Sequence, residues 1–290
     1  MRGPDDQGID SLLPLDIAQK AETIGVQKTR MDPLRLVTLG VLAGAFIAFG
    51  AMFATTVLAG TDGVVPFGIS RLLSGLVFCT GLILIIVGGA ELFTGNTLMV
   101  MAWAAGKVRL REMLRAWGIV LVGNFIGATG TAVLVFLSGQ YFSGKGGVAA
   151  VALGIATAKV SLSFDRALFL GILCNTLVCL AVWISYGART TVDKVIAVIF
   201  PISAFVAAGF EHSVANMYFI PFGLLIKTWA PASLWTQIGG SAANYGALTW
   251  PAFFSSLIPV TIGNIIGGGG LVGAVYWFIY LRKRALRQDG

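Results

Sequence analysis

The chain has 290 residues, of which 57% are hydrophobic and 11% are charged, and its mean hydropathy is +0.86. Soluble domains carry about 25% charged residues, so this composition indicates an integral membrane protein and argues against a soluble one. The net charge of +7 raises nucleic acid binding as an alternative. The basic residues, however, cluster in short segments between apolar runs, which is typical of membrane topology and argues against a nucleic acid partner.

Residues 1–34 are polar and mixed. They contain no basic segment leading into an apolar run, so we expect no cleavable signal peptide. Apolar residues recur there at the spacing of one helix face, which predicts an amphipathic helix on the cytoplasmic surface of the membrane. That face consists of Ile9, Leu12, Leu13, Ile17 and Ala21. A further hypothesis is that this helix gates the protein with pH.

Four long apolar runs follow, each longer than the roughly 18 residues that mark a membrane-spanning helix. They cover residues 36–61, 116–144, 167–188 and about 256–281. Most basic residues lie before the first run, in two short loops and after the last run, so the positive-inside rule places both termini in the cytoplasm. We therefore expect a single transmembrane domain over residues 35–282 and a cytoplasmic tail over residues 283–290.

Two further apolar segments have the wrong length for a simple span. Residues 72–106 are interrupted only by Glu91, and residues 195–226 only by Glu211 and His212. As one helix the first segment would be about 50 Å long, against a hydrocarbon core of about 30 Å. We predict that each helix breaks near the middle of the membrane, at "GGAELFTGN" and at "AGFEHSVAN". Broken helices are tolerated where they line a polar cavity, so these segments are the best indication of a transport site.

The two halves of the chain resemble each other. The breaks share a spacing of Glu91 to Asn96 and Glu211 to Asn216, and "VGNFIGA" (122–128) matches "IGNIIGG" (262–268). "LGVLAG" (39–44) likewise matches "LGILCN" (170–175). The pattern predicts two copies of a three-helix unit, over about residues 35–140 and 167–282. An odd number of spans turns the second copy over, which gives six segments as a 3+3 inverted repeat. The paired GxxxG spacings, at 123–127 and 263–267, indicate close helix contacts.

Five motifs together carry a family resemblance. "GGAELFTGNTL", "LVGNFIGA", "LGILCNTLVCLAVW", "GFEHSVANMYFIP" and "IPVTIGNIIGGG" occur in this order over essentially the whole chain, which resembles the formate/nitrite transporter family, most closely its formate channel branch. The resemblance implies an all-α membrane protein with an aquaporin-like protomer and two broken helices. It also implies a homopentamer in a bacterial inner membrane, with a separate pore for a small monovalent anion in each protomer.

The predicted function is transport of formate or a similar small anion. Nitrite or hydrosulfide remains an alternative within the family. A neutral-solute channel of the aquaporin type is an alternative from another class, but "FTGN" and "SVAN" are not the paired Asn-Pro-Ala motifs of such channels. An enzyme is disfavoured because the chain has one histidine, no metal-ligand cluster and no Ser–His–Asp arrangement. We expect no metal and no cofactor.

The only histidine, His212, lies at the second break. An imidazole with an unperturbed pKa of about 6.5 suits a group that protonates a small anion or neutralises it by charge. The alternative is a buried histidine satisfied by hydrogen bonds. The resemblance places Thr94 in a flexible loop facing this histidine, where its hydroxyl donates to the anion. The alternative for Thr94 is a hydrogen bond within its own helix.

Other candidate residues divide into three groups. Asn175 offers an amide donor or, alternatively, a polar contact between helices, and the resemblance makes Lys159 a residue that attracts anions and raises their acidity. The resemblance also places an apolar constriction at Phe78, Leu82 and Leu92 on one side and Phe205 and Val178 on the other. Carboxylates in a membrane are costly and are usually paired. We therefore expect a structural frame of buried polar residues, formed by Glu91, Glu211, Asn96 and Asn216. In this frame the carboxylates bond the N–H groups of a broken helix end or a neighbouring subunit. Asn124 and Asn264 are expected in the same frame.

Overall fold

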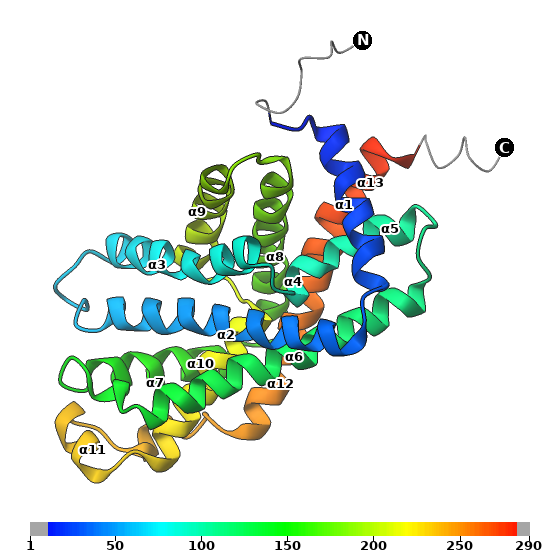
Figure 1. The fold of residues 1–290 in the computed structure, drawn as a ribbon. Helices are drawn as coiled ribbons and strands as arrows, with labels where there is room; N and C mark the ends of the chain where they lie inside the picture. Colours follow the sequence, from blue (N-terminus) through cyan, green and yellow to red (C-terminus); the bar gives the residue numbers. More distant parts are fainter. Residues whose placement is uncertain (1–10, 283–290) are drawn as a thin grey trace.

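The structure is a computed structural model and describes residues 11–282. Every secondary-structure element in this range is a helix, which confirms the expected all-α class (Figure 1). The predicted tail at residues 283–290, and Ile9 of the predicted amphipathic face, lie outside the described residues.

Five helical runs are long and apolar enough to cross a membrane. They are α2 (Pro33–Leu58), α3 (Phe67–Gly88), α6 (Leu110–Leu137), α8 (Phe164–Gly187) and the C-terminal run Ala242–Tyr280. The helices begin a few residues earlier than the apolar runs because their first turns contain polar capping residues. At α2, for example, the Asp32 carboxylate accepts a hydrogen bond from the Arg35 N–H at 3.0 Å, and Pro33 occupies the first helical position.

Both predicted helix breaks are present. The first lies between α3 and α4 (Phe93–Asn96), after which the chain continues through η1 (Thr97–Met99) into α5 (Val100–Ala104). The second separates α9 (Thr191–Ala207) from α10 (Ser213–Trp229). A glycine with positive φ follows the helix end at each break, Gly89 at 82° and Gly209 at 75°. Glycine is favoured there because a side chain clashes with the backbone in this conformation.

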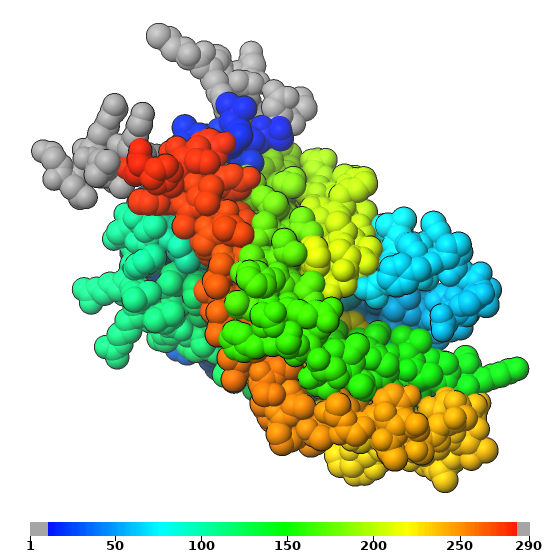
Figure 2. Space-filling view, turned by 180° about the vertical axis from the view of Figure 1, so that it is seen from behind, coloured from blue at the N-terminus to red at the C-terminus, as the bar shows by residue number. Residues whose placement is uncertain are grey.

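The C-terminal run is less regular than predicted. It comprises α12 (Trp250–Ile265), a π-helical segment η4 (Ile266–Ala274) and α13 (Val275–Tyr280). The run also includes the short helix η3 (Ala242–Tyr245) at its start, and the short helix α11 (Ala232–Ile238) precedes it. π-Helical segments are often found at functional sites, and η4 packs against α8 and η1 beside the first break. Figure 2 shows this run, in orange and red, passing along the molecule beside the green segment that contains α7 and α8.

Corresponding helices of the two halves pack in corresponding pairs. In the first half α2 packs against α3 and α6, and in the second half α8 packs against α9 and α12. The two halves meet where α3 packs against α9, where α10 packs against α6, and where η4 packs against η1 (Figure 1). Two elements between the halves had no counterpart in the predicted repeat, η2 (Gln140–Phe142) and α7 (Gly147–Val160), and α7 packs against α10.

The N-terminal helix α1 (Pro14–Thr29) lies at one end of the molecule beside α5, α8 and α13 (Figure 1). Ile17 and Ala21 are buried in a cluster with Trp183 and Leu281, and the predicted position of this helix on the cytoplasmic surface stays a prediction. Leu13 is 57% exposed because the helix begins only at Pro14.

Glycines of the GxxxG spacings allow helices to pack backbone against backbone. A Cβ placed on Gly127 of α6 would lie 1.9 Å from the Val41 carbonyl oxygen of α2, and one on Gly267 would lie 2.2 Å from the Ile172 carbonyl oxygen of α8. Real Cβ atoms do not approach so closely, so each helix pair depends on the missing side chain. Close backbone contact of this kind is a main source of helix association in membranes.

We predict that Gly127→Ala destabilises the protein by about 1–3 kcal/mol or more, because α2 and α6 must separate to admit the methyl group. Gly130→Ala on the same helix is the control, since its Cβ would meet no atom within 4 Å. The measurement is the midpoint of thermal unfolding in detergent micelles. Equal midpoints for the two variants would show that the close approach is dispensable.

Candidate transport site

An asparagine satisfies the backbone at the first break. Asn124 of α6 donates from Nδ2 to the carbonyl oxygens of Gly40 (2.8 Å) and Glu91 (2.9 Å), and its Oδ1 accepts the Phe93 N–H at 2.8 Å. Asn124 is completely buried. A single side chain therefore joins α2, α6 and both sides of the break.

The second break is built in the same way. Asn264 of α12 donates from Nδ2 to the carbonyl oxygens of Gly171 (2.8 Å) and Glu211 (3.0 Å), and its Oδ1 accepts the Ser213 N–H at 2.9 Å. The two asparagines hold equivalent positions in the repeat and make equivalent contacts. Unpaired polar groups are costly in a membrane interior, and these bonds are the reason that both breaks persist.

His212 caps the resumed helix of the second break. Its Nδ1 accepts the Ala215 N–H at 3.1 Å, and its Nε2 lies 3.0 Å from Thr94 Oγ1. Because Nδ1 is an acceptor, a neutral ring carries its proton on Nε2 and donates it to Thr94. His212 is 2% exposed and Thr94 is fully buried, so these two ring contacts fix both its orientation and its tautomer.

Thr94, which the resemblance implied to lie in a flexible loop facing the histidine, lies in the one-turn helix α4. Three side chains donate to its carbonyl oxygen: Thr97 Oγ1 at 2.6 Å, Asn175 Nδ2 at 3.2 Å and Cys179 Sγ at 3.4 Å. These bonds stabilise a helical turn immediately after the break. Because Thr94 Oγ1 accepts from the neutral histidine, its hydroxyl hydrogen remains available to an anion.

Asn175 joins helices and does not present a donor to a cavity. Its Nδ2 contacts the Thr94 carbonyl oxygen, Thr97 Oγ1 (3.2 Å) and the Asn264 carbonyl oxygen (2.6 Å). An amide nitrogen has two hydrogens, and these three acceptors occupy both. The expected role as an anion donor is therefore not supported by the geometry, and the alternative of a polar contact between helices fits it.

The buried carboxylates at the two breaks, Glu91 and Glu211, are paired with lysines. Glu211 contacts Lys159 Nζ at 2.8 Å and accepts from Asn216 Nδ2 at 2.7 Å. Among the described residues, both carboxylates bond lysine and asparagine side chains and not the N–H groups of a broken helix end, while the expected alternative of a neighbouring subunit stays a prediction. Asn124, Asn264 and His212 already occupy such N–H groups at both breaks. Lys159 comes from α7, which places a cation deep enough to reach Glu211.

Glu91 has an equivalent partner that the sequence analysis missed. It contacts Lys28 Nζ at 2.9 Å and accepts from Asn96 Nδ2 at 2.8 Å, while Lys28 also donates to Asn96 Oδ1 at 2.6 Å. Lys28 belongs to α1 and lies outside the predicted repeat, so the repeat pattern did not indicate it. The available signal was the carboxylate itself, since a buried Glu91 requires a cation.

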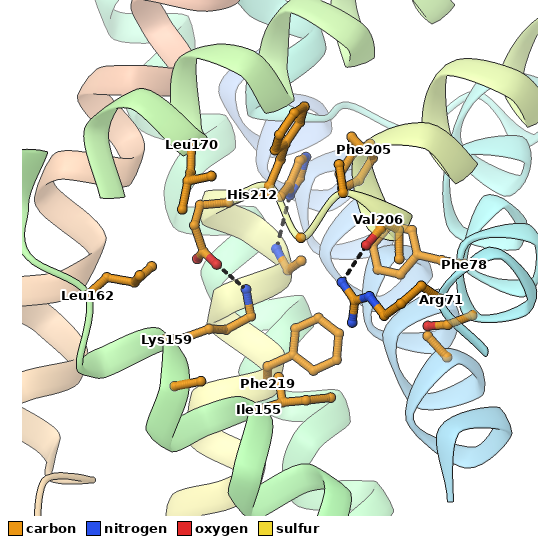
Figure 3. Close-up of a pocket in the computed structure, with 18 of the residues that line it drawn as sticks. Arg71, Phe78, Ile155, Lys159, Leu162, Leu170, Phe205, Val206, His212 and Phe219 are labelled. Carbon is orange, nitrogen blue, oxygen red and sulfur yellow. Dashed lines mark hydrogen bonds and ion pairs between the residues drawn. The ribbon is translucent and has the colours of Figure 1, made fainter. Parts of the chain in front are cut away.

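Two cavities approach the Thr94–His212 pair from opposite halves of the site. The α7-side cavity has a volume of about 380 Å³, and Figure 3 shows His212, Lys159, Arg71, Phe78 and Phe205 at its wall. The α1-side cavity has a volume of about 290 Å³ and includes Leu92 and Gly95, the neighbours of Thr94. Each wall carries three cations and one carboxylate. The cations are Arg71, Lys159 and Arg166 in the first cavity and Lys20, Lys28 and Lys194 in the second.

The predicted constriction residues are all buried, but they divide differently between the two sides. Phe78 and Phe205 line the α7-side cavity and meet edge to face with their ring centroids 5.7 Å apart. Leu82 and Leu92 line the α1-side cavity. Val178 belongs to the buried apolar cluster that contains the other four. Each cavity therefore has a pair of large apolar side chains in its wall, close to the Thr94–His212 contact.

No group of three potential metal ligands occurs within residues 11–282. The side chains that line the two cavities include hydrogen-bond donors, lysine and arginine cations and apolar groups. An electropositive cavity concentrates small anions near its walls.

A family model described as formate/nitrite transporter matches residues 15–278. The chain belongs to this family. It is a multi-pass membrane transport protein and not an enzyme.

The match to curated relatives extends over nearly the full length. The chain is 44% identical to formate channel FocA of Escherichia coli strain K12, over 96% of this chain and 98% of that protein. It is 39% identical to formate channel FocA of Haemophilus influenzae, over 91% and 93% of the two chains. Among solved structures, a pentameric formate channel with formate bound superposes with a TM-score of 0.82 at 40% identity, covering 86% of this chain and 98% of that one.

We predict that Glu211→Gln destabilises the protein by about 3–5 kcal/mol, because it leaves the Lys159 charge buried without a partner. Adding Lys159→Met should recover most of the loss, since the unpaired charge is then removed. The measurement is reversible unfolding in detergent micelles, arranged as a double-mutant cycle. Arg166→Gln, at an exposed cation of the same cavity, is the control and should change stability by less than about 0.5 kcal/mol. Additive effects of the two substitutions would contradict the pairing.

Proposed function

We propose that this chain transports formate, or a small monovalent anion of similar size, through a pore that joins the two cavities past Thr94 and His212. The observation that carries the proposal is the buried Thr94–His212 contact between two cation-lined cavities. The relatives described above are formate channels, and one similar structure contains formate. The cation-lined cavities favour an anion over a neutral solute.

The proposed architecture has six membrane segments arranged as a 3+3 inverted repeat, with an aquaporin-like protomer in a homopentamer. Support comes from the equivalent contacts of Asn124 and Asn264 and from the equivalent lysine pairs of Glu91 and Glu211. The similar solved structure is described as pentameric. The positive-inside pattern favours a bacterial inner membrane with both termini in the cytoplasm, which directs the α1-side cavity inward and the α7-side cavity outward.

The proposed transport step begins with an anion attracted by the cations of one cavity. It loses water at the apolar pair and reaches the Thr94 hydroxyl, which donates a hydrogen bond to it. Formate is the base of an acid with a pKa of about 3 to 4, in the range of carboxyl groups. A bare anion crosses an apolar constriction at high cost, so a proton or a positive partner is required at this point.

The hydrogen bonds of His212 define how it supplies that charge. The neutral ring is a donor through Nε2, and further protonation must occur at Nδ1, where the Ala215 N–H now binds. An anion beside the ring offsets the cost of losing this cap, because the imidazolium and the anion then form an ion pair. His212 therefore acts as a neutral donor without the anion and as a cation or acid only in its presence.

We predict that wild-type protein in proteoliposomes takes up radiolabelled formate, with more uptake at external pH 5 than at pH 8. The His212→Phe variant should lose this uptake by about tenfold or more, because the hydrogen-bond donor to Thr94 and the cap of α10 are both lost. His212→Asn is the matched control, because asparagine caps helix N-termini well and cannot titrate. It should keep the fold and lose the pH dependence.

Competition with nitrite in the same vesicles tests the nature of the anion. Stronger uptake of nitrite than of formate would assign the chain to nitrite instead. Normal uptake by His212→Phe at both pH values would show that the imidazole is only structural.

A further inference from the structure

Arg71 binds the end of the broken helix α9. It lies on α3, and its guanidinium donates from Nη2 to the Val206 carbonyl oxygen at 2.5 Å and from Nε to the Ala207 carbonyl oxygen at 3.3 Å (Figure 3). The side chain is half-buried and lines the α7-side cavity.

These contacts meet a need that the break creates. The last carbonyl groups of a helix have no partner within it, and its C-terminal end carries partial negative charge. Val206 and Ala207 are the last two residues of α9 before the break. The planar guanidinium fork can bind both carbonyl oxygens together, which a lysine ammonium on a flexible stem does less well.

The same stretch of the α3–α9 interface carries the aromatic constriction. Phe205 directly precedes the carbonyls that Arg71 binds, and Phe78 lies two helical turns after Arg71 on α3. Between them, a Cβ on Gly75 would lie 2.6 Å from the Ser203 carbonyl oxygen, so the two helices are in direct backbone contact. The position of Phe205 relative to Phe78 thus depends on how firmly the end of α9 is held against α3.

We propose that Arg71 is a positioning and specificity-determining residue that sets the aperture between Phe78 and Phe205. By holding the last turn of α9 against α3, it keeps the gap between the two aromatic rings narrow, so that formate passes more readily than larger anions. The inference rests on the proposed function, since it concerns which anions pass the same pore. Arg71 acts through Phe205, so its effect is on size selectivity.

The test compares uptake of radiolabelled formate and acetate by proteoliposomes that contain wild type, Arg71→Gln or Arg71→Lys. Both variants should raise the acetate-to-formate uptake ratio by roughly tenfold, the factor that the loss of one charged hydrogen bond represents. Arg71→Lys keeps the charge, so a change in that variant separates the hydrogen-bonding fork from simple attraction of anions.

Arg166→Gln is the matched control, since Arg166 is an exposed cation of the same cavity. It should lower uptake of both anions by the same factor and leave the ratio unchanged. An unchanged ratio in both Arg71 variants, or a change in Arg71→Gln alone, would overturn the inference. If Arg71→Gln fails to fold, Arg71→Lys decides the test. Absence of formate uptake by the wild type would instead refute the proposed function.

Discussion

The structure depends on one constraint, which is that backbone groups freed inside a membrane must find hydrogen-bond partners within the protein. Two helices are broken there, and Asn124 and Asn264 each bind one N–H and two carbonyl groups around a break. His212 and Arg71 satisfy further groups at the second break, the first at the start of α10 and the second at the end of α9. Of these four residues, His212 and Arg71 also line the α7-side cavity of the proposed path.

The repeat equivalent of His212 is Leu92, which also follows a buried glutamate and also occupies the residue before a resumed helix. Leucine offers no side-chain cap, and the helix after it, α4, ends within one turn and passes into the 3₁₀ segment η1. Histidine does cap, and α10 continues to Trp229. In the first half this position is therefore followed by a short turn, which side chains stabilise and which contains Thr94. In the second half the imidazole occupies this position and a regular helix follows it. This difference brings a hydroxyl and a ring nitrogen together at the centre of an otherwise repeated arrangement.

Charge is distributed with the same near-symmetry. Each half buries a glutamate that a lysine and an asparagine satisfy, so neither carboxylate opposes an anion with its full charge. The remaining cations give both cavities a positive wall, while Phe78, Phe205, Leu82 and Leu92 make the approach to the centre apolar. The positively charged cavities concentrate small anions. An anion passes an apolar constriction only when a hydrogen-bond donor or a cation stabilises its charge.

The sequence by itself determined the membrane class, the long apolar helices, the two breaks and the pairing of equivalent motifs. These features follow from local composition and spacing, because a helix of fixed rise in a core of fixed thickness leaves few alternatives. Only the tertiary structure decided which group each of these buried polar side chains binds. Lys28 and Lys159 lie on α1 and α7, outside the repeat, and reach Glu91 and Glu211 only through packing. The roles of Asn175 and Arg71, and the tautomer of His212, likewise depend on carbonyl and N–H groups presented by distant helices. Sequence spacing identifies which residues are polar in an apolar environment, but hydrogen-bond geometry between non-adjacent helices assigns each its partner.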